Sequence, residues 1–184
     1  MYLTEGPDGT PTTRKLNDTI AYNWILANYH SSMAIDNDDG SAWYDTHDNV
    51  FISLSEGAAY GGNSLKTDFG GHSNFHHGNL DLFFSRGFGI VGTLAGFADG
   101  YYDNYLYLGT TSASTPYGDG QACTGPAKTI VQNNTVWVPQ GTTVTECGTS
   151  IAAWQAQGGD PGTTVSTYPA DSVVLAKARQ ILGF

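Results

Sequence analysis

Most of the polar chemistry of this 184-residue chain lies in two short segments, residues 34–49 and 65–79. Only 13% of all residues are charged, so this crowding is unusual for the chain. The segments contain acidic and basic side chains that could act together: Asp36, Asp38, Asp39, His47, Lys66, Asp68 and His72. Groups that perturb one another's protonation are typical of acid–base and metal sites. We therefore predict that the two segments form the functional site.

The carboxylates of the first segment have a spacing that suits paired acid–base work. In an extended chain Asp36 and Asp38 face one side and Asp39 the other, because side chains alternate. Their backbones would lie about 6.5 Å apart, which allows either the retaining or the inverting geometry of glycoside hydrolases. Two alternatives stay open. The segment resembles a calcium loop without its final glutamate, and it could also be an acidic turn that binds nothing.

Lys66 and Asp68 have two possible relations. Flanking Thr67, they share a face if the segment is extended. Lys66 could act as a base if burial lowers its pKa, or it could simply form an ion pair with Asp68. Four further side chains are expected to contact a substrate, namely Trp43, Tyr44, His76 and Arg86. The two aromatic residues could instead belong to the core.

An internal repeat positions these groups. Segments that begin at His47 and His72 align at a spacing of 25 residues. Short β-type runs follow asparagines at Asn23, Asn49, Asn104 and Asn134, and each run is bounded by turn-forming residues. Short strands that return every 20–30 residues without intervening helices indicate a β-solenoid, in which coils stack at about 4.8 Å. The alternative is a β-sandwich with chance asparagines at its strand starts.

A coil of 25 residues would place His47 and His72 at equivalent positions of adjacent coils. Their imidazoles would then stack and could relay protons or bind a metal. They could equally form a structural ladder that hydrogen-bonds backbone carbonyls. Because neighbouring strand residues face opposite sides, at most one of His76 and His77 joins them, and we expect His76.

Composition limits the class of protein and of partner. The chain has 24 glycines and a net charge of −10, typical of a turn-rich β protein that avoids nucleic acids and anionic membranes. It has no apolar run long enough to insert into a membrane. Cys123 and Cys147 are the only cysteines and predict a disulfide, the alternative being two buried free thiols. We expect an extracellular protein, a single β-helix domain over 1–184 that forms the C-terminal part of a longer protein.

The end of the chain predicts one helix. Over residues 169–183, Val174, Ala178, Ile181 and Leu182 fall on one face, and Gly183 suits the helix end. We expect this helix to cap the last of the coils, which would occupy residues 19–150, by covering its open edge and apolar interior.

The asparagine-led strands and the recurrence near 25 residues resemble the right-handed parallel β-helix proteins of the pectin-lyase-like superfamily, over residues 19–138. The resemblance implies an all-β, right-handed parallel β-helix and a polysaccharide or oligosaccharide partner bound along one sheet. It does not select an activity, since members include hydrolases, lyases and non-catalytic adhesins.

A glycoside hydrolase is the leading hypothesis for the activity, because acidic groups outnumber basic ones in the two segments. The alternatives are a polysaccharide lyase that uses Lys66 with calcium, and a non-catalytic carbohydrate-binding or surface module. Each would use the same two polar segments.

Overall fold

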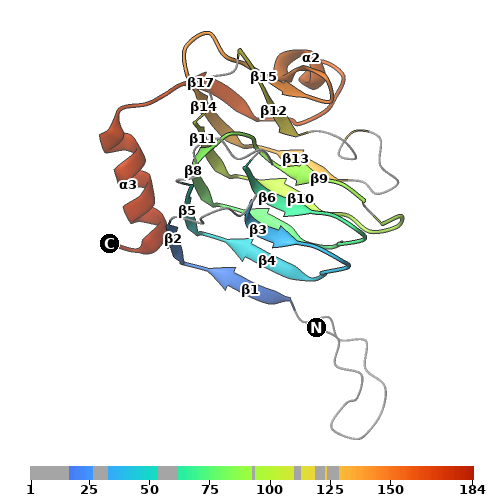
Figure 1. The fold of residues 1–184 in the computed structure, drawn as a ribbon. Helices are drawn as coiled ribbons and strands as arrows, with labels where there is room; N and C mark the ends of the chain where they lie inside the picture. Colours follow the sequence, from blue (N-terminus) through green and yellow to red (C-terminus); the bar gives the residue numbers. More distant parts are fainter. Residues whose placement is uncertain are drawn as a thin grey trace, which may run out of the picture.

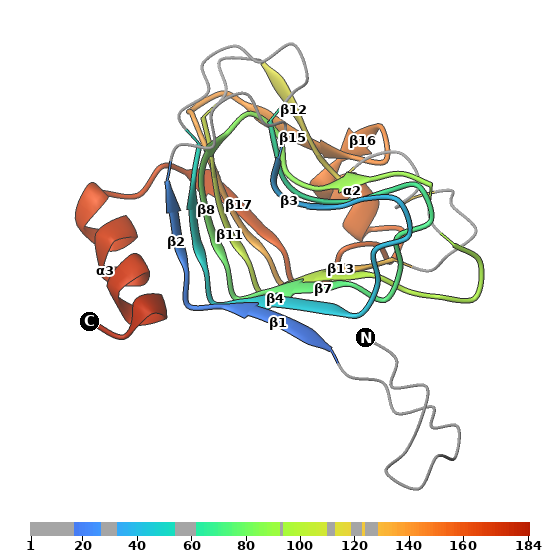
Figure 2. The ribbon, with the colours of Figure 1, turned by 60° about the horizontal axis from the view of Figure 1, so that its bottom comes forward.

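The protein is a parallel β-solenoid, described here from a computed structural model (Figures 1 and 2). The structure describes residues 17–26, 33–53, 62–92, 94–109, 113–118, 123 and 129–184. Successive coils stack in the order of the sequence, so that each strand pairs in parallel with the equivalent strand one coil later. The predicted solenoid is therefore confirmed, and the β-sandwich alternative is wrong.

Three sheets form the walls of the solenoid. The first sheet contains β1 (Asp18–Ala21), β4 (Tyr44–His47), β7 (Phe75–His77), β10 (Gly100–Tyr102) and β13 (Ile130–Gln132). The second contains β2 (Trp24–Leu26), β5 (Val50–Ile52), β8 (Leu80–Phe84), β11 (Tyr105–Leu108), β14 (Thr135–Val138) and β17 (Thr164–Thr167). The third contains β3 (Met33–Asn37), β6 (Asn63–Thr67) and β9 (Gly89–Ile90). Figure 2 looks along the stack and shows the walls enclosing one interior.

A smaller sheet closes the late coils. It contains β12 (Ser114–Gly118), β15 (Thr143–Glu146) and β16 (Thr149–Ser150), and a parallel bridge from Phe88 to Gly118 links it to the coil below. β16 runs antiparallel to β15 and leads into helix α2 (Ile151–Gln155). The Ser150 hydroxyl accepts the N–H of Ala153 and so caps that helix.

An asparagine ladder fixes the corner between the first and second sheets. Each asparagine side-chain oxygen accepts the backbone N–H and the amide N–H of the asparagine one coil earlier, through Asn23, Asn49, Asn79, Asn104 and Asn134. Thr163 accepts the last backbone N–H at 2.9 Å. The residue before each asparagine has a positive φ, which turns the chain at every coil.

The ladder corrects the predicted coil length. Successive rungs lie 26, 30, 25, 30 and 29 residues apart, so no constant period describes the stack. The rung above Asn49 is Asn79, and Asn74 belongs to a different corner, where it accepts the N–H of Tyr44. A parallel solenoid tolerates this variation because only strands and corners must stay in register, whereas turns absorb extra residues.

Apolar side chains fill the interior of the solenoid. Its buried cluster runs from Phe51 and Leu65 through Leu106 to Val144 and Ile151, so α2 contributes Ile151 to the last layer. The interior also holds polar groups, most notably His76 and Asp81, which are both fully buried.

Asp81 interrupts an apolar row of the second sheet, since it pairs with Phe51 on one side and Leu106 on the other. Burial raises the pKa of Asp81 to about 7, and a hydrogen bond with Ser64 only partly opposes this. Because the folded pKa lies above the unfolded one, this carboxyl lowers the stability of the fold progressively as pH rises from about 4 to about 7.

Replacing Asp81 with Asn should remove this penalty. The ionised carboxylate costs on the order of 4 kcal/mol at pH 8, and because a buried amide also costs something, we expect a net gain of about 2 kcal/mol. Urea unfolding of both proteins between pH 5 and pH 8 measures the effect, with pH values chosen to bracket about 7. A gain that is equal at every pH would contradict the assigned titration.

The C-terminal helix α3 (Asp171–Leu182) is confirmed, and it ends at Gly183, whose φ is 76°. Its predicted apolar face packs on Val50, Leu80 and Leu82 of the second sheet. Figure 2 shows the helix beside that sheet, outside the solenoid. It thus covers an outward-facing apolar surface of the middle coils, and the end of the last coil is covered by α2 instead.

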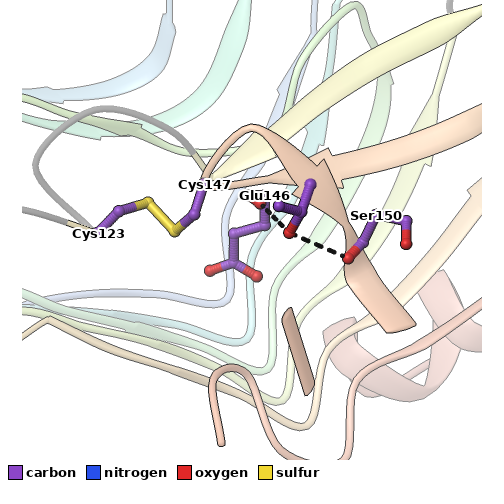
Figure 3. The surroundings of a disulfide bond; sticks show 5 residues. Cys123, Glu146, Cys147 and Ser150 are labelled. Atoms are coloured by element: carbon purple, nitrogen blue, oxygen red, sulfur yellow. Dashed lines mark hydrogen bonds between the residues drawn. A yellow bond between two sulfur atoms is a disulfide. The ribbon is translucent and has the colours of Figure 1, made fainter. Parts of the chain in front are cut away.

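The predicted disulfide between Cys123 and Cys147 is also confirmed (Figure 3). It joins residues 24 positions apart and anchors the chain just after β15. We expect the double replacement of both cysteines by serine to lower the free energy of unfolding by about 3 kcal/mol, because the open chain gains entropy. Reductant should produce a similar loss in the unmodified protein and none in the variant, as measured by urea unfolding. An unchanged unfolding midpoint in the variant would contradict this prediction.

Candidate functional site

The acidic cluster, defined here as Asp36, Asp38 and Asp68 around Lys66, lies where the third sheet ends. β3 and β6 are paired so that Asp36 lies directly beside Lys66. The Lys66 ammonium lies 2.8 Å from Asp36 Oδ1, 3.5 Å from Asp38 Oδ2 and 2.6 Å from Asp68 Oδ2. Carboxylates from two coils therefore converge on one cation.

Two equivalent turns bring Asp38 and Asp68 together. Each aspartate is followed by a residue and a glycine that both have positive φ, Asp39-Gly40 in one coil and Phe69-Gly70 in the next. Each aspartate carbonyl accepts the N–H three residues later, from Ser41 at 2.9 Å and from Gly71 at 2.8 Å. The backbone N–H of Asp68 also donates to the carbonyl of Asn37 at 3.1 Å, which stacks the second turn on the first.

Glycines make room for this packing. A Cβ at position 71 would lie 2.8 Å from the carbonyl oxygen of Asn37 and from a methyl of Thr67. One coil further, a Cβ at position 89 would lie 3.4 Å from the Lys66 stem. The side chain of Lys66 therefore lies over Gly89, in space that a larger residue would occupy.

Lys66 stays protonated in this setting. Burial alone would lower the pKa of Lys66, but hydrogen bonds and charge attraction from Asp36 and Asp68 outweigh it and raise the pKa above its ordinary value. A permanent ammonium cannot accept a proton, so the geometry gives no support to Lys66 as a base. The alternative relation predicted from the sequence, an ion pair with Asp68, is confirmed.

Asp68 and Asp38 hold one proton between them. Burial raises the pKa of Asp68 to about 6, and its hydrogen bond with Asp38 raises it as well, although Lys66 opposes both effects. The same hydrogen bond is the largest cause of a lowered pKa at Asp38. Asp68 is thus the donor and Asp38 the acceptor, so their environments separate two like groups into an acid and a base.

The cluster opens to solvent on one side. The side chain of Asp68 is only 6% exposed and that of Lys66 only 12%, whereas those of Asp36 and Asp38 are each 42% exposed. Phe69, next to Asp68, is 67% exposed, and the sequence analysis did not include it. An exposed aromatic ring beside carboxylates is a suitable surface for the apolar face of a sugar.

Three oxygens of the cluster, one from each aspartate, lie within 4.8 Å of one another. Oxygen ligands at such spacing suit calcium, the possible cofactor considered from the sequence. However, the Lys66 ammonium already lies among all three carboxylates and neutralises part of their charge. A calcium ion would have to displace it, so this arrangement favours an ion-pair network over a calcium site.

Asp39 lies outside the cluster although it was predicted within it. It is exposed, and its backbone N–H donates to Asp38 Oδ1 at 2.8 Å. The predicted alternation therefore holds, since Asp36 and Asp38 both reach Lys66 while Asp39 faces away. Arg86 is likewise exposed, and its backbone bridges to Asn63 in β6.

The predicted stacking of His47 on His72 is wrong. His47 stacks on His77, with ring centroids 5.0 Å apart and planes 6° apart, because β4 and β7 pair at a spacing of 30 residues. His77 in turn stacks on Tyr102 at 5.0 Å. Carboxylates flank this ring stack, with Asp48 2.9 Å from His47 Nδ1 and Asp45 2.9 Å from His77 Nε2.

His72 belongs to a separate corner. Its Nδ1 lies 3.0 Å from the Gly70 carbonyl, and its ring contacts Phe97 at 4.3 Å and the edge of Trp43 at 6.0 Å. Trp43 is only 8% exposed, so it is a core residue rather than a sugar platform. Tyr44 is half-buried at the start of β4.

His76 points into the solenoid, contrary to the expectation that it would join the outer histidines. It is fully buried and stacks on Tyr101 with ring centroids 4.9 Å apart. Burial lowers the pKa of His76 to about 3, so the imidazole is neutral at physiological pH. No substrate can reach it there.

No helix in the described part of the chain combines the length and the apolar character needed to cross a membrane. Comparison with protein-family models, curated proteins and solved structures gives no significant match. The fold is therefore established as a parallel β-helix on its own geometry, and the activity must be argued from the acidic cluster itself.

Proposed function

We propose that this protein is an extracellular glycoside hydrolase that cleaves a neutral polysaccharide at the acidic cluster, as a pectin-lyase-like β-helix. The observation that carries the proposal is the division of labour between two adjacent carboxyls, Asp68 with a raised pKa and Asp38 with a lowered one. A carboxylic acid that keeps its proton near neutral pH is the group that protonates a glycosidic oxygen. The net charge of −10 favours a neutral polymer over a uronate.

The roles of the residues follow from exposure and contacts. The Asp38–Asp68 pair supplies the proton to the leaving oxygen as the bond to the anomeric carbon breaks. Asp36, the other solvent-facing carboxylate, forms an ester bond to that carbon. Water then attacks the ester carbon and gives its proton back to the pair, which releases Asp36 and restores the starting state.

Retention of configuration is the expected stereochemical outcome. The aspartate oxygens lie within 4.8 Å of one another, close to the roughly 5–5.5 Å of retaining enzymes and below the roughly 6.5–9.5 Å that admits a water between the carboxyls. Lys66 orients all three aspartates and stays a cation throughout. A lyase would need a base in that place, so the lyase alternative receives less support.

An extracellular location is supported by the disulfide between Cys123 and Cys147, because such bonds persist in oxidising environments. The exposed Phe69 supports a polymer substrate, since its ring lies next to the acid and could hold a sugar.

A screen against neutral and acidic polysaccharides tests the proposal. We expect new reducing ends from a neutral polymer, unchanged by chelator, and proton NMR of the first product should show the anomer of the substrate. Unsaturated products from a uronate polymer would support the lyase instead. Binding of the polymer without cleavage would support a non-catalytic module.

A further inference from the structure

A second candidate site lies at the C-terminal end of the stack, apart from the acidic cluster. A cavity of about 450 Å³ opens between β13, the end of β15, α2 and the loop that follows α2. Its lining includes the side chains of Gln132, Glu146, Trp154 and Asp160. This volume lies in the range of small-molecule sites and exceeds that of a single sugar ring.

Two buried carboxyls form the polar end of the cavity. Glu146 and Asp160 are only 2% and 4% exposed, and they are hydrogen-bonded to each other. Figure 3 shows the Glu146 side chain directed away from the disulfide at Cys147. Two carboxyls that share a hydrogen bond must share a proton, so the pair carries a single negative charge.

The loop that carries Asp160 is built to hold this carboxyl in place. Asp160 has a φ of 40°, a conformation uncommon outside glycine. The Gln155 amide donates to its carbonyl at 3.0 Å, and the Thr163 hydroxyl donates to its Oδ1 at 2.6 Å. These bonds leave Oδ2 to face Glu146 and the cavity.

Trp154 forms the aromatic wall. A Cβ at position 159 would lie 2.1 Å from the indole Nε1, so Gly159 lets the ring pack against the loop. An indole next to a buried negative charge is a preferred environment for an ammonium group, through cation–π attraction together with charge pairing. The lining residues include two acids and no lysine, arginine or histidine.

We propose that this cavity binds a cationic amino sugar, with the ammonium against the Glu146–Asp160 pair and the ring against Trp154. An anionic sugar would be repelled by the pair, and a neutral sugar would leave its buried charge without a counter-charge. The hydroxyls of the sugar would find partners in Gln132 and in Thr129, which also lines the cavity. This site is independent of hydrolysis at the acidic cluster.

Titration with glucosamine, followed by amide and indole NMR under mildly acidic conditions, tests the proposal. We expect saturable shifts of the Trp154 indole N–H and of the Gly159 amide, with a dissociation constant on the order of 1 mM. N-acetylglucosamine, which has the same ring without the charge, should bind at least about tenfold more weakly. The indole signals of Trp24, Trp43 and Trp137 serve as internal controls and should not move.

Two variants separate binding from folding. Glu146→Gln removes the charge of the pair, and Trp154→Leu removes the ring; each should weaken glucosamine binding about tenfold, read from the Gly159 amide. Trp24→Leu, at a tryptophan 56% exposed on the second sheet, is the matched control and should bind normally. If Glu146→Gln does not fold, the Trp154 variant and the two sugars still decide the outcome. Equal binding of the two sugars, or no Trp154 shift at about 50 mM glucosamine, would overturn the proposal.

Discussion

Replacing Asp68 with Asn is expected to lower the rate of polysaccharide hydrolysis by about 10²–10⁴-fold, because the amide cannot hold the proton that the leaving oxygen needs. Asn keeps the size of Asp68 and an oxygen that can accept a hydrogen bond from Lys66. Lys66 also retains Asp36 and Asp38 as partners. We therefore expect the melting temperature to change little while kcat falls.

Asp39→Asn is the matched control for this variant. It makes the same chemical change in the equivalent turn one coil earlier, at an exposed residue outside the cluster. Its hydrolysis rate should equal that of the unmodified protein. Equal rates for Asp68→Asn and the unmodified protein would exclude the proposed acid, and equal losses of rate and stability would assign Asp68 a structural role.

The pH profile provides an independent reading of the same group. Since Asp68 must be protonated and its pKa is raised to about 6, hydrolysis should decline as pH rises through that value. The rate of Asp39→Asn should follow the same profile. A rate that stays constant across this range would contradict the acid role.

Replacing Asn79 with Ala is expected to lower the free energy of unfolding by about 5 kcal/mol, the largest stability change that we predict. Asn79 is fully buried at the centre of the ladder. Its side chain accepts two hydrogen bonds from Asn49 and donates to the Thr46 carbonyl and to Asn104. Alanine would leave several of these buried groups without a partner, which costs more than the bonds alone.

Asn23→Ala makes the same change at the end of the ladder. Asn23 is exposed, and its side chain donates only to Ala21 and Asn49, so water can replace what is lost. We expect a loss of less than about 1 kcal/mol in urea unfolding. Similar losses at both positions would mean that the ladder does not hold the coils together.

The architecture was predictable from the sequence because its signals are local. Asparagines at positions 23, 49, 104 and 134 lead strands, and four of the five ladder rungs could be identified from them. Asn79 was missed because a constant spacing of 25 residues drew attention to Asn74 instead. The apolar face of α3 was correctly predicted from its helical period, but no local pattern indicates which surface such a face will cover.

A different alignment would have found the site geometry. Asp-x-Gly occurs at 38–40 and at 68–70, and an asparagine follows eleven residues after each aspartate, at Asn49 and Asn79. That spacing of 30 residues stacks Asp38 on Asp68 and His47 on His77, as the strand registers have it. An error of five residues is odd-numbered, so it also exchanged the inner and outer faces and placed His76 outside.

The protonation states could not be predicted from residue types alone. Lys66 has the sequence context of either a base or an ion-pair partner, and only its position among three carboxylates decides between them. Likewise, Asp38 and Asp68 are chemically identical residues in equivalent turns. Their pKa values differ because Asp68 is buried while Asp38 faces solvent.

Titration of the aspartate carboxyl carbons by ¹³C NMR is the most direct test of the central claim, because it needs no substrate. We predict that Asp68 titrates with a pKa of about 6 and that the pKa of Asp38 lies below its ordinary value. Asn at position 38 should lower the pKa of Asp68, since the neighbouring carboxylate would be gone. An Asp68 that titrates at or below about 4, like an ordinary aspartate, would contradict the assignment of the acid and with it the proposed hydrolase.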